Sequence, residues 1–227
     1  MSKAIKTKYW DARLAAQHRS GAWDTVKQGY DEPHRTYHGW GHIGDLLKKL
    51  DRFSDLATRA DLIAAAIFWH DVVYQTQNSD GSYRPDIVNV RQSAESFLRH
   101  SLFAPVETAA VEAMILATGD HMATADSLEP YAGFSSDLDL FLDLDLSGLG
   151  ASWPKVSRDT QRIRREFAWV AEAAFCTGRA AILRGFVTDG RPLYRRDETN
   201  RAWSASARAN LTRSIAELEA RAVAAGG

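Results

Sequence analysis

A helical period in the apolar residues dominates this chain and limits the folds open to it. Leu211, Ile215, Leu218 and Ala222 follow one another at intervals of three or four residues, with charged residues between them. This spacing places the four side chains on one face of an α-helix. No apolar/polar alternation is long enough to predict a strand. The sequence therefore predicts an all-α protein, with further helices at 42–53, 62–69, 90–101, 105–117 and 158–176 and with loops at 75–86 and 124–136, where turn-forming residues gather.

Length and charge narrow the class of protein further. The chain has 227 residues, of which 45% are apolar, so it can bury a large core, and we expect one domain over 1–227. Its 28 basic and 29 acidic residues give a net charge of −1, which favours neither a nucleic-acid surface nor an anionic membrane as partner. Cys176 is the single cysteine, the longest apolar run has eight residues, Leu62 to Trp69, and the N-terminus has no signal-peptide core. These features predict a cytoplasmic protein.

Two histidines lie four residues apart in the segment Tyr37 to Ile43. On a helix, His38 and His42 would project from one face, and the glycines between them would let His38 lie just before the helix begins. Such a pair can bind a ligand. It can equally cap a helix or stack on neighbouring rings, and the segment alone leaves both interpretations open.

His70 and Asp71 follow the eight-residue apolar run directly. An ionised carboxylate buried beside a histidine costs several kcal/mol unless a partner compensates it. A divalent metal ion is such a partner, because imidazole and carboxylate are both ligands of Zn, Mn and Fe. The alternative is an ordinary helix C-terminus, where His70 meets the negative end of the helix dipole.

Two more carboxylates, Asp143 and Asp145, alternate with leucines in Phe141 to Ser147. Simple alternation, with the aspartates outward and the leucines inward, explains Asp143 as well as a function does. With Asp145 the candidates form the order His…His-Asp…Asp, separated by 28 positions (42 to 70) and 74 positions (71 to 145). Two histidines and two carboxylates leave coordination positions open to water, which is typical of a catalytic metal site.

This order, on an all-α chain, resembles the HD-domain superfamily of metal-dependent phosphohydrolases. The chain is most similar to a bacterial family of uncharacterised HD phosphohydrolases of about this length. The similarity extends from about residue 9 to about residue 220, and it is carried by the segments RTYHGWGHI, AIFWHDVVY, NVRQSAE, ILATGDH, FLDLDLSGLGA, RIRREF and GRAAILRGF.

The resemblance implies a role for each candidate. His42, His70, Asp71 and Asp145 would bind a divalent ion, which could be Mn, Mg, Ni, Co, Fe or Zn, and His38 would protonate the leaving oxygen. The implied reaction is hydrolysis of a phosphoester or phosphoanhydride in a small-molecule phosphorylated substrate, with a nucleotide among the candidates. A partial similarity to cyclic-nucleotide phosphodiesterases covers the same residues. The chain has neither their further histidine after the His-Asp pair nor a recognisable purine-binding glutamine.

Phosphate oxygens need fixed cationic partners, and Arg35, Arg164 and His121 are the candidates for substrate binding. His121 could also touch a second ion. Arg91 is better explained as a surface residue. Glu95 could hold a metal-bound water, or it could be an ordinary glutamate on a helix surface. Two alternative functions remain on the same residues: a di-iron oxygenase with the same fold, and a non-catalytic helical protein that binds a metal or a nucleotide.

Overall fold

A computed structural model of the chain describes residues 6–121, 133–187 and 192–226. All regular structure within these ranges is helical, and the only β-type pairings there are two isolated bridges, so the all-α prediction is confirmed. The chain divides into two compact units, Met1–Leu144 and Asp145–Gly227. The expectation of one domain over 1–227 stays a prediction beside this division. No helix in the described ranges is long and apolar enough to cross a membrane.

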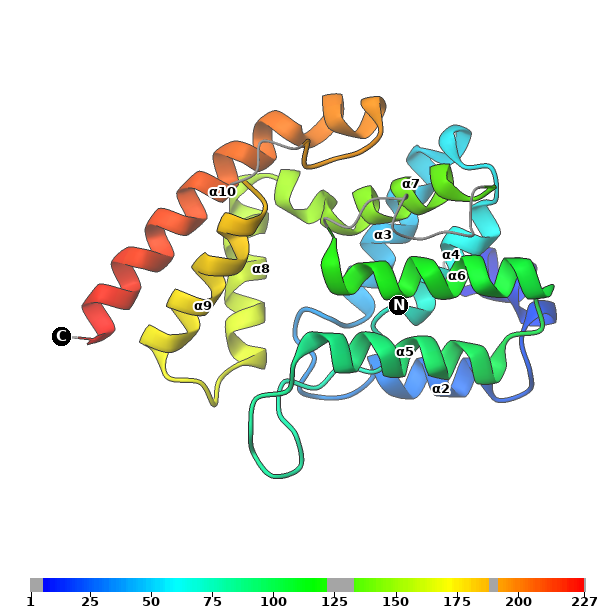
Figure 1. Ribbon diagram of the computed structural model, residues 1–227, viewed down its shortest axis with the longest axis horizontal. Helices are drawn as coiled ribbons and strands as arrows, with labels where there is room; N and C mark the ends of the chain where they lie inside the picture. The colour runs from blue at the N-terminus through cyan, green and yellow to red at the C-terminus, as the bar shows by residue number, and fades with distance from the viewer. Residues whose placement is uncertain (1–5, 122–132, 188–191, 227) are drawn as a thin grey trace. The chain divides into compact units, whose positions relative to one another are not determined.

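Within its described residues the first unit contains six α-helices, one nine-residue π-helix and three short 3₁₀ turns. Figure 1 shows their course. Those predicted from the sequence are found within four residues of their expected starts and ends. In chain order the elements are η1 (Lys6–Leu14), η2 (Ala15–Gln17), α2 (Ala22–Tyr30), α3 (Trp40–Arg52), η3 (Ser54–Leu56), α4 (Ala60–Trp69), α5 (Asp86–His100), α6 (Pro105–Ala117), η4 (Thr118–Asp120) and α7 (Ser135–Leu146), whose last two residues belong to the second unit.

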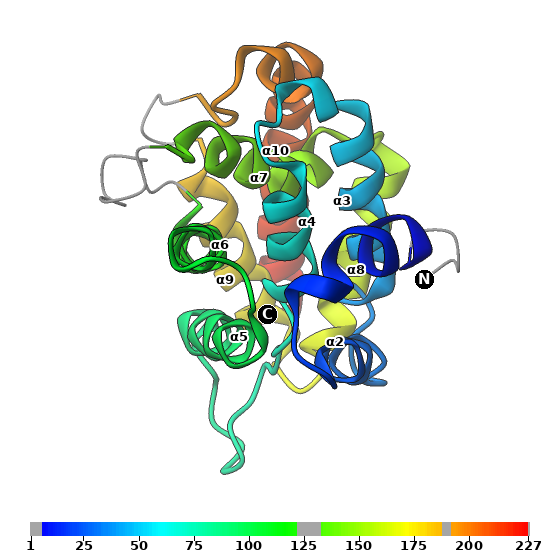
Figure 2. The ribbon, with the colours of Figure 1, turned by 90° about the vertical axis from the view of Figure 1, so that its right-hand side faces the viewer.

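Helix α4 is the centre of the first unit. It contacts α3, α5, α6 and η1, and Figure 2 shows it between α3 and α6. Each residue from Leu62 to Trp69 is fully buried. A helix without a polar face must be covered on all sides, so the apolar run that predicted this helix also fixes its central place. The His-Asp pair follows at its C-terminal end.

The start of α4 is held by a side chain from far along the sequence. Asp137, on α7, is fully buried, and its carboxylate accepts the backbone N–H groups of Thr58 at 2.7 Å and Arg59 at 2.9 Å. Arg59 is the N-cap residue of α4. These two bonds satisfy donors at the helix start and place a negative charge there, where the helix dipole favours one.

The second unit contains η6 (Ser147–Gly150), α8 (Trp153–Glu166), α9 (Glu172–Gly185) and α10 (Asp197–Gly226). Helices α9 and α10 pack along each other, and α10 also contacts η6 and α8. The expected helix over 158–176 is wrong, because a turn separates α8 from α9 at 167–171. Phe167 and Val170 keep the helical spacing of apolar residues, although the backbone between them turns.

The two predicted loops differ in outcome. The 75–86 loop is confirmed up to Pro85. It contains one isolated bridge between Gln77 and Tyr83, and Asp86 already opens α5. Most of the 124–136 loop lies outside the described residues, and α7 begins within it at Ser135.

Candidate metal centre

Three of the four ligands expected from the sequence lie together in the first unit. His42 comes from α3, His70 ends α4, and Asp71 follows it. One ligand atom of each lies within 4.8 Å of the other two. The His42 and His70 Nε2 atoms are 3.3 Å apart, and His70 Nε2 is 3.1 Å from an Asp71 carboxylate oxygen.

These separations fit a shared metal ion. Ligand atoms about 2.0–2.1 Å from one ion lie about 3.0 Å apart at octahedral angles and about 3.4 Å apart at tetrahedral angles. The two short distances in the group, 3.3 Å and 3.1 Å, lie in this interval. The donor set of two imidazoles and a carboxylate suits Zn, Mn, Fe, Co and Ni.

The surroundings of His70 prepare its Nε2 atom for this role. The residue is 2% exposed, and its Nδ1 atom lies 3.0 Å from the backbone carbonyl oxygen of Ile67. A carbonyl oxygen can only accept, so Nδ1 carries a proton, and Nε2 is the ring nitrogen left to bind a metal ion. The ring of Phe141 packs edge-on against the imidazole, with 5.9 Å between centroids.

Asp71 is partly buried and is held in its ionised form. Burial alone would raise the pKa of its carboxyl, but the adjacent His70, together with His38 and His42, holds that pKa well below the ordinary range. A carboxylate that stays charged at neutral pH is ready to bind a cation.

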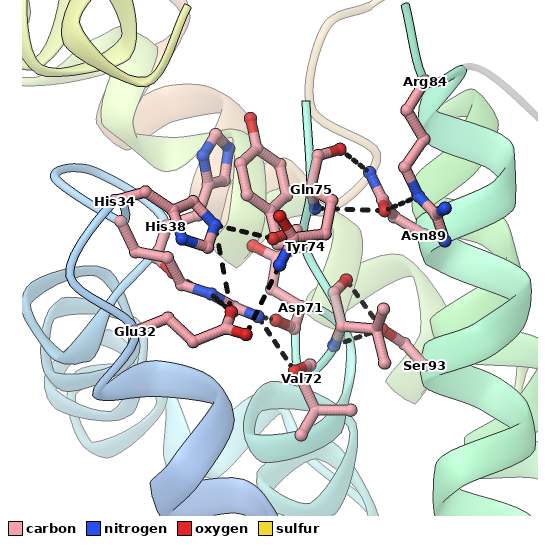
Figure 3. A network of polar contacts seen from close by, with 12 residues as sticks. Glu32, His34, His38, Asp71, Val72, Tyr74, Gln75, Arg84, Asn89 and Ser93 are labelled. Atoms are coloured by element: carbon pink, nitrogen blue, oxygen red, sulfur yellow. Dashed lines mark hydrogen bonds and ion pairs between the residues drawn. The ribbon is translucent and has the colours of Figure 1, made fainter. Parts of the chain in front are cut away.

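His38 lies in the turn before α3, as the sequence predicted, and outside the ligand group. Its ring stacks on Tyr74 with 4.0 Å between centroids (Figure 3). The His42 ring lies 6.3 Å from it. Neither flanking glycine has a positive φ. Space at Gly39 is restricted instead, since a Cβ there would meet the Arg35 carbonyl oxygen at 3.3 Å.

The segment after Asp71 is tied to α5 by two side chains one helical turn apart. Ser93 Oγ accepts the Val73 N–H at 3.1 Å, and Asn89 pairs with both backbone groups of Gln75 at 2.9 and 3.1 Å (Figure 3). Both belong to the segment NVRQSAE, and the sequence reasoning missed this structural role. An Asn and a Ser at i and i+4, just after a loop, were the available signal.

Asp145, the fourth expected ligand, lies in the last turn of α7 as the first residue of the second unit. Its role as a ligand stays a prediction. The turn after it is fastened within its own unit, because Asn210 donates to the carbonyl oxygens of Leu149 and Ala151, both at 2.8 Å. Asp143 is fully buried, so the interpretation that it points outward is wrong.

The substrate-binding candidates have different surroundings. The Arg35 and Arg164 guanidinium groups both bond to protein acceptors and are described below, and their phosphate contacts stay predictions. His121 follows η4. Burial, and then Asp71, raise the pKa of the Asp86 carboxyl, while His38, Asn89 and His121 lower it. His121 thus belongs to the electrostatic surroundings of Asp86. Arg91 and Glu95 are exposed on α5, as expected of surface residues.

Two histidines that carried no signal in the sequence have clear structural roles. His18 is buried between Trp10 and Trp69, whose rings lie 5.0 and 5.7 Å from it, and Trp69 donates to its Nε2 at 3.0 Å. His34 lies with its Nε2 atom 3.0 Å from the Tyr74 carbonyl oxygen.

Comparison of the chain with protein-family models and with curated proteins gave no match. The functional argument therefore rests on the residues and on their geometry.

Proposed function

We propose that this protein is a metal-dependent phosphohydrolase that cleaves a phosphoester or a phosphoanhydride. The observation that carries the proposal is the ligand group His42, His70 and Asp71, whose closest atoms have the spacing of one coordination sphere. When bound, a divalent ion would supply a water activated at neutral pH and would neutralise phosphate charge. Asp145 is proposed as the fourth ligand, on the resemblance alone.

The chain's own residues divide the work. His70, with its tautomer fixed by Ile67, and His42 supply nitrogen ligands, and the charged Asp71 supplies an oxygen ligand. His38 lies outside the ligand group and is partly exposed. That arrangement suits a general acid, which must reach the leaving oxygen and keep its proton until the bond breaks.

Metal analysis followed by a substrate screen tests the proposal. Purified protein is analysed by plasma mass spectrometry, and phosphoesters and phosphoanhydrides are then offered with Mn, Co, Ni or Mg. We expect a bound divalent ion and metal-dependent phosphate release, and we expect His70→Ala and Asp71→Ala to lose both. Wild-type metal content in both variants would show that the site is misassigned. Bound iron with oxygen consumption and no phosphate release would favour the oxygenase instead.

A further inference from the structure

Arg35 is buried in the first unit although it carries a permanent charge. Its side chain is 1% exposed, and its Nε–H donates to Glu32 Oε2 at 2.7 Å. Glu32 also accepts from the Gln75 side chain at 3.3 Å. The charge of Arg35 is therefore compensated locally, as a buried cation requires.

The remaining contacts of the guanidinium join two segments that carry functional candidates. Nη1 donates to the Asp71 carbonyl oxygen at 2.5 Å and approaches that of His38 at 3.5 Å, and Nη2 donates to the Val72 carbonyl oxygen at 3.0 Å. Glu32, Asp71 and Val72 lie close together beside His38 and Tyr74 (Figure 3). One planar group thus bonds to the backbone of a metal ligand and lies against that of the proposed proton donor.

Neighbouring groups restrict the guanidinium further. It lies 5.5 Å from the centre of the Tyr30 ring and 5.8 Å from the centre of the Tyr74 ring. The Tyr74 ring also stacks on the His38 ring, with 4.0 Å between centroids. A Cβ on Gly29 would approach the Val72 carbonyl oxygen to 2.3 Å, so α2 presses its bare backbone against the same acceptor. The Val72 carbonyl group is therefore contacted from two sides, by Arg35 and by the backbone of α2.

We propose that Arg35 is a positioning residue of the metal centre and not a phosphate ligand. Its guanidinium fixes the Asp71 backbone relative to His38. The Asp71 carboxylate therefore stays close enough to His70 Nε2 for both to bind the same ion. This inference rests on the proposed function only where it concerns catalysis, because its effect on metal affinity needs no substrate. A lysine cannot replace it, because one ammonium cannot serve Glu32 and two carbonyl oxygens in a fixed plane.

Chemical rescue of metal binding tests the proposal. Mn²⁺ affinity is measured by equilibrium dialysis for wild type, Arg35→Ala and Arg35→Lys, with and without millimolar guanidinium chloride. Changes in groups that orient metal ligands typically weaken affinity about 10- to 100-fold, and we expect that loss for both variants. Guanidinium ion should restore much of it in Arg35→Ala by occupying the vacated space. Sodium chloride at equal ionic strength, and uncharged urea, should not.

Arg164→Ala is the matched control, because Arg164 makes the same kinds of bonds in the second unit. Its Nε donates to Glu172 at 2.7 Å and its Nη atoms donate to the carbonyl oxygens of Phe167 at 2.5 Å and Val170 at 2.8 Å. We expect wild-type Mn²⁺ affinity for this variant and no response to guanidinium.

Each other outcome has a defined meaning. The proposal is overturned if Arg35→Ala or Arg35→Lys folds and keeps wild-type Mn²⁺ affinity. It is also overturned if Arg35→Ala folds and loses Mn²⁺ affinity but guanidinium does not restore it. If Arg35→Ala does not fold, Arg35→Lys decides by its affinity. Once an ester that the enzyme hydrolyses is known, the kinetics of Arg35→Lys can be measured. The proposal requires a lower kcat and a KM within about threefold of the wild-type value. A raised KM with unchanged metal affinity would indicate that Arg35 binds phosphate. Rescue of metal binding without any phosphatase activity would refute the proposed function and leave the role of Arg35 intact.

Discussion

Arg35 and Arg164 use the same bonds to do different things. Each places its Nε on a glutamate and its Nη atoms on backbone carbonyl oxygens. The acceptors of Arg164 lie within eight residues of it, so it closes the local turn between α8 and α9. Arg35 instead bonds to the carbonyl oxygens of Asp71 and Val72. These residues lie 36 and 37 positions further along the chain, just after the end of the central helix α4.

The difference indicates that the role of an arginine bonded to backbone carbonyl oxygens depends on how far along the chain those acceptors lie. A local arginine stabilises one corner of a helix pair. A long-range arginine couples the position of one segment to that of another, and in the first unit those segments carry His38 and Asp71. We therefore expect disturbances around Arg35 to appear in metal binding, and disturbances around Arg164 to appear in stability and not in metal binding.

Of the substitutions that test stability, Gly29→Ala should have the largest effect. The added methyl group would collide with the Val72 carbonyl oxygen, and overpacking of this kind typically costs about 1–3 kcal/mol. Denaturant unfolding should show that loss, and Mn²⁺ affinity should fall with it.

Gly178→Ala is the control for this prediction in the second unit. Gly178 lies within α9, and nothing lies within 4 Å of a Cβ placed there. Alanine should stabilise that helix by about 0.5–1 kcal/mol and leave Mn²⁺ affinity unchanged. Equal effects of the two substitutions would break the comparison between the units.

Asp137→Ala should be next in size. It removes both bonds to the start of α4, and loss of a helix cap typically costs about 0.5–2 kcal/mol. Ser152→Ala is the matched variant in the second unit, because Ser152 is the N-cap residue of α8 and makes no capping bond with its side chain. Thermal unfolding should separate the two variants, and a Ser152→Ala variant as damaged as Asp137→Ala would contradict the assignment.

Acid should affect the two units in different pH windows. Burial, and the nearby His100, lower the pKa of His18 from its ordinary 6.5, although its bond to Leu14 opposes them. The unfolded chain then binds the proton more readily, so the stabilisation is complete above about pH 6.5 and is lost as pH falls through the folded pKa. Unfolding followed from pH 7 to pH 5 should show this loss, and His18→Gln should reduce it.

The corresponding window for the second unit lies lower. Bonds from Arg164 and Arg221 lower the pKa of Glu172 from 4.5 to about 2. Its stabilisation is present above about pH 4.5 and disappears toward pH 2, with a small amplitude because Glu172 is partly exposed. Glu172→Gln should flatten only this lower window. A change in the window above pH 5 would show that the two groups are coupled.

The sequence predicted the parts of the fold that depend on local pattern. Leu62 to Trp69 is long and continuously apolar, which fixed α4 and the burial of the histidine that follows it. The turn after α8 escaped prediction because Phe167 and Val170 continue the helical spacing, and the bonds that make the turn come from Arg164. A pattern of apolar residues does not report where a guanidinium will find its acceptors.

The site was predictable to the same extent. His42, His70 and Asp71 were recognised from residue type and order, and the structure brings them together. The position of Arg35 was not predictable, because its acceptors are backbone atoms that any residue would supply. His18 escaped for a related reason, since burial between Trp10 and Trp69 arises only from tertiary packing.

The most direct test of the account compares His38→Ala with His42→Ala, by metal content and by kcat/KM on an alkyl and a nitrophenyl phosphoester. His42→Ala should lose the metal. His38→Ala should keep it, and should lose about 10²–10⁴-fold in rate on the alkyl ester but much less on the nitrophenyl ester, whose leaving group hardly needs a proton. If His38→Ala loses metal as His42→Ala does, or is equally impaired on both esters, His38 is not the general acid. If His42→Ala retains wild-type metal content, the metal centre itself is wrongly assigned.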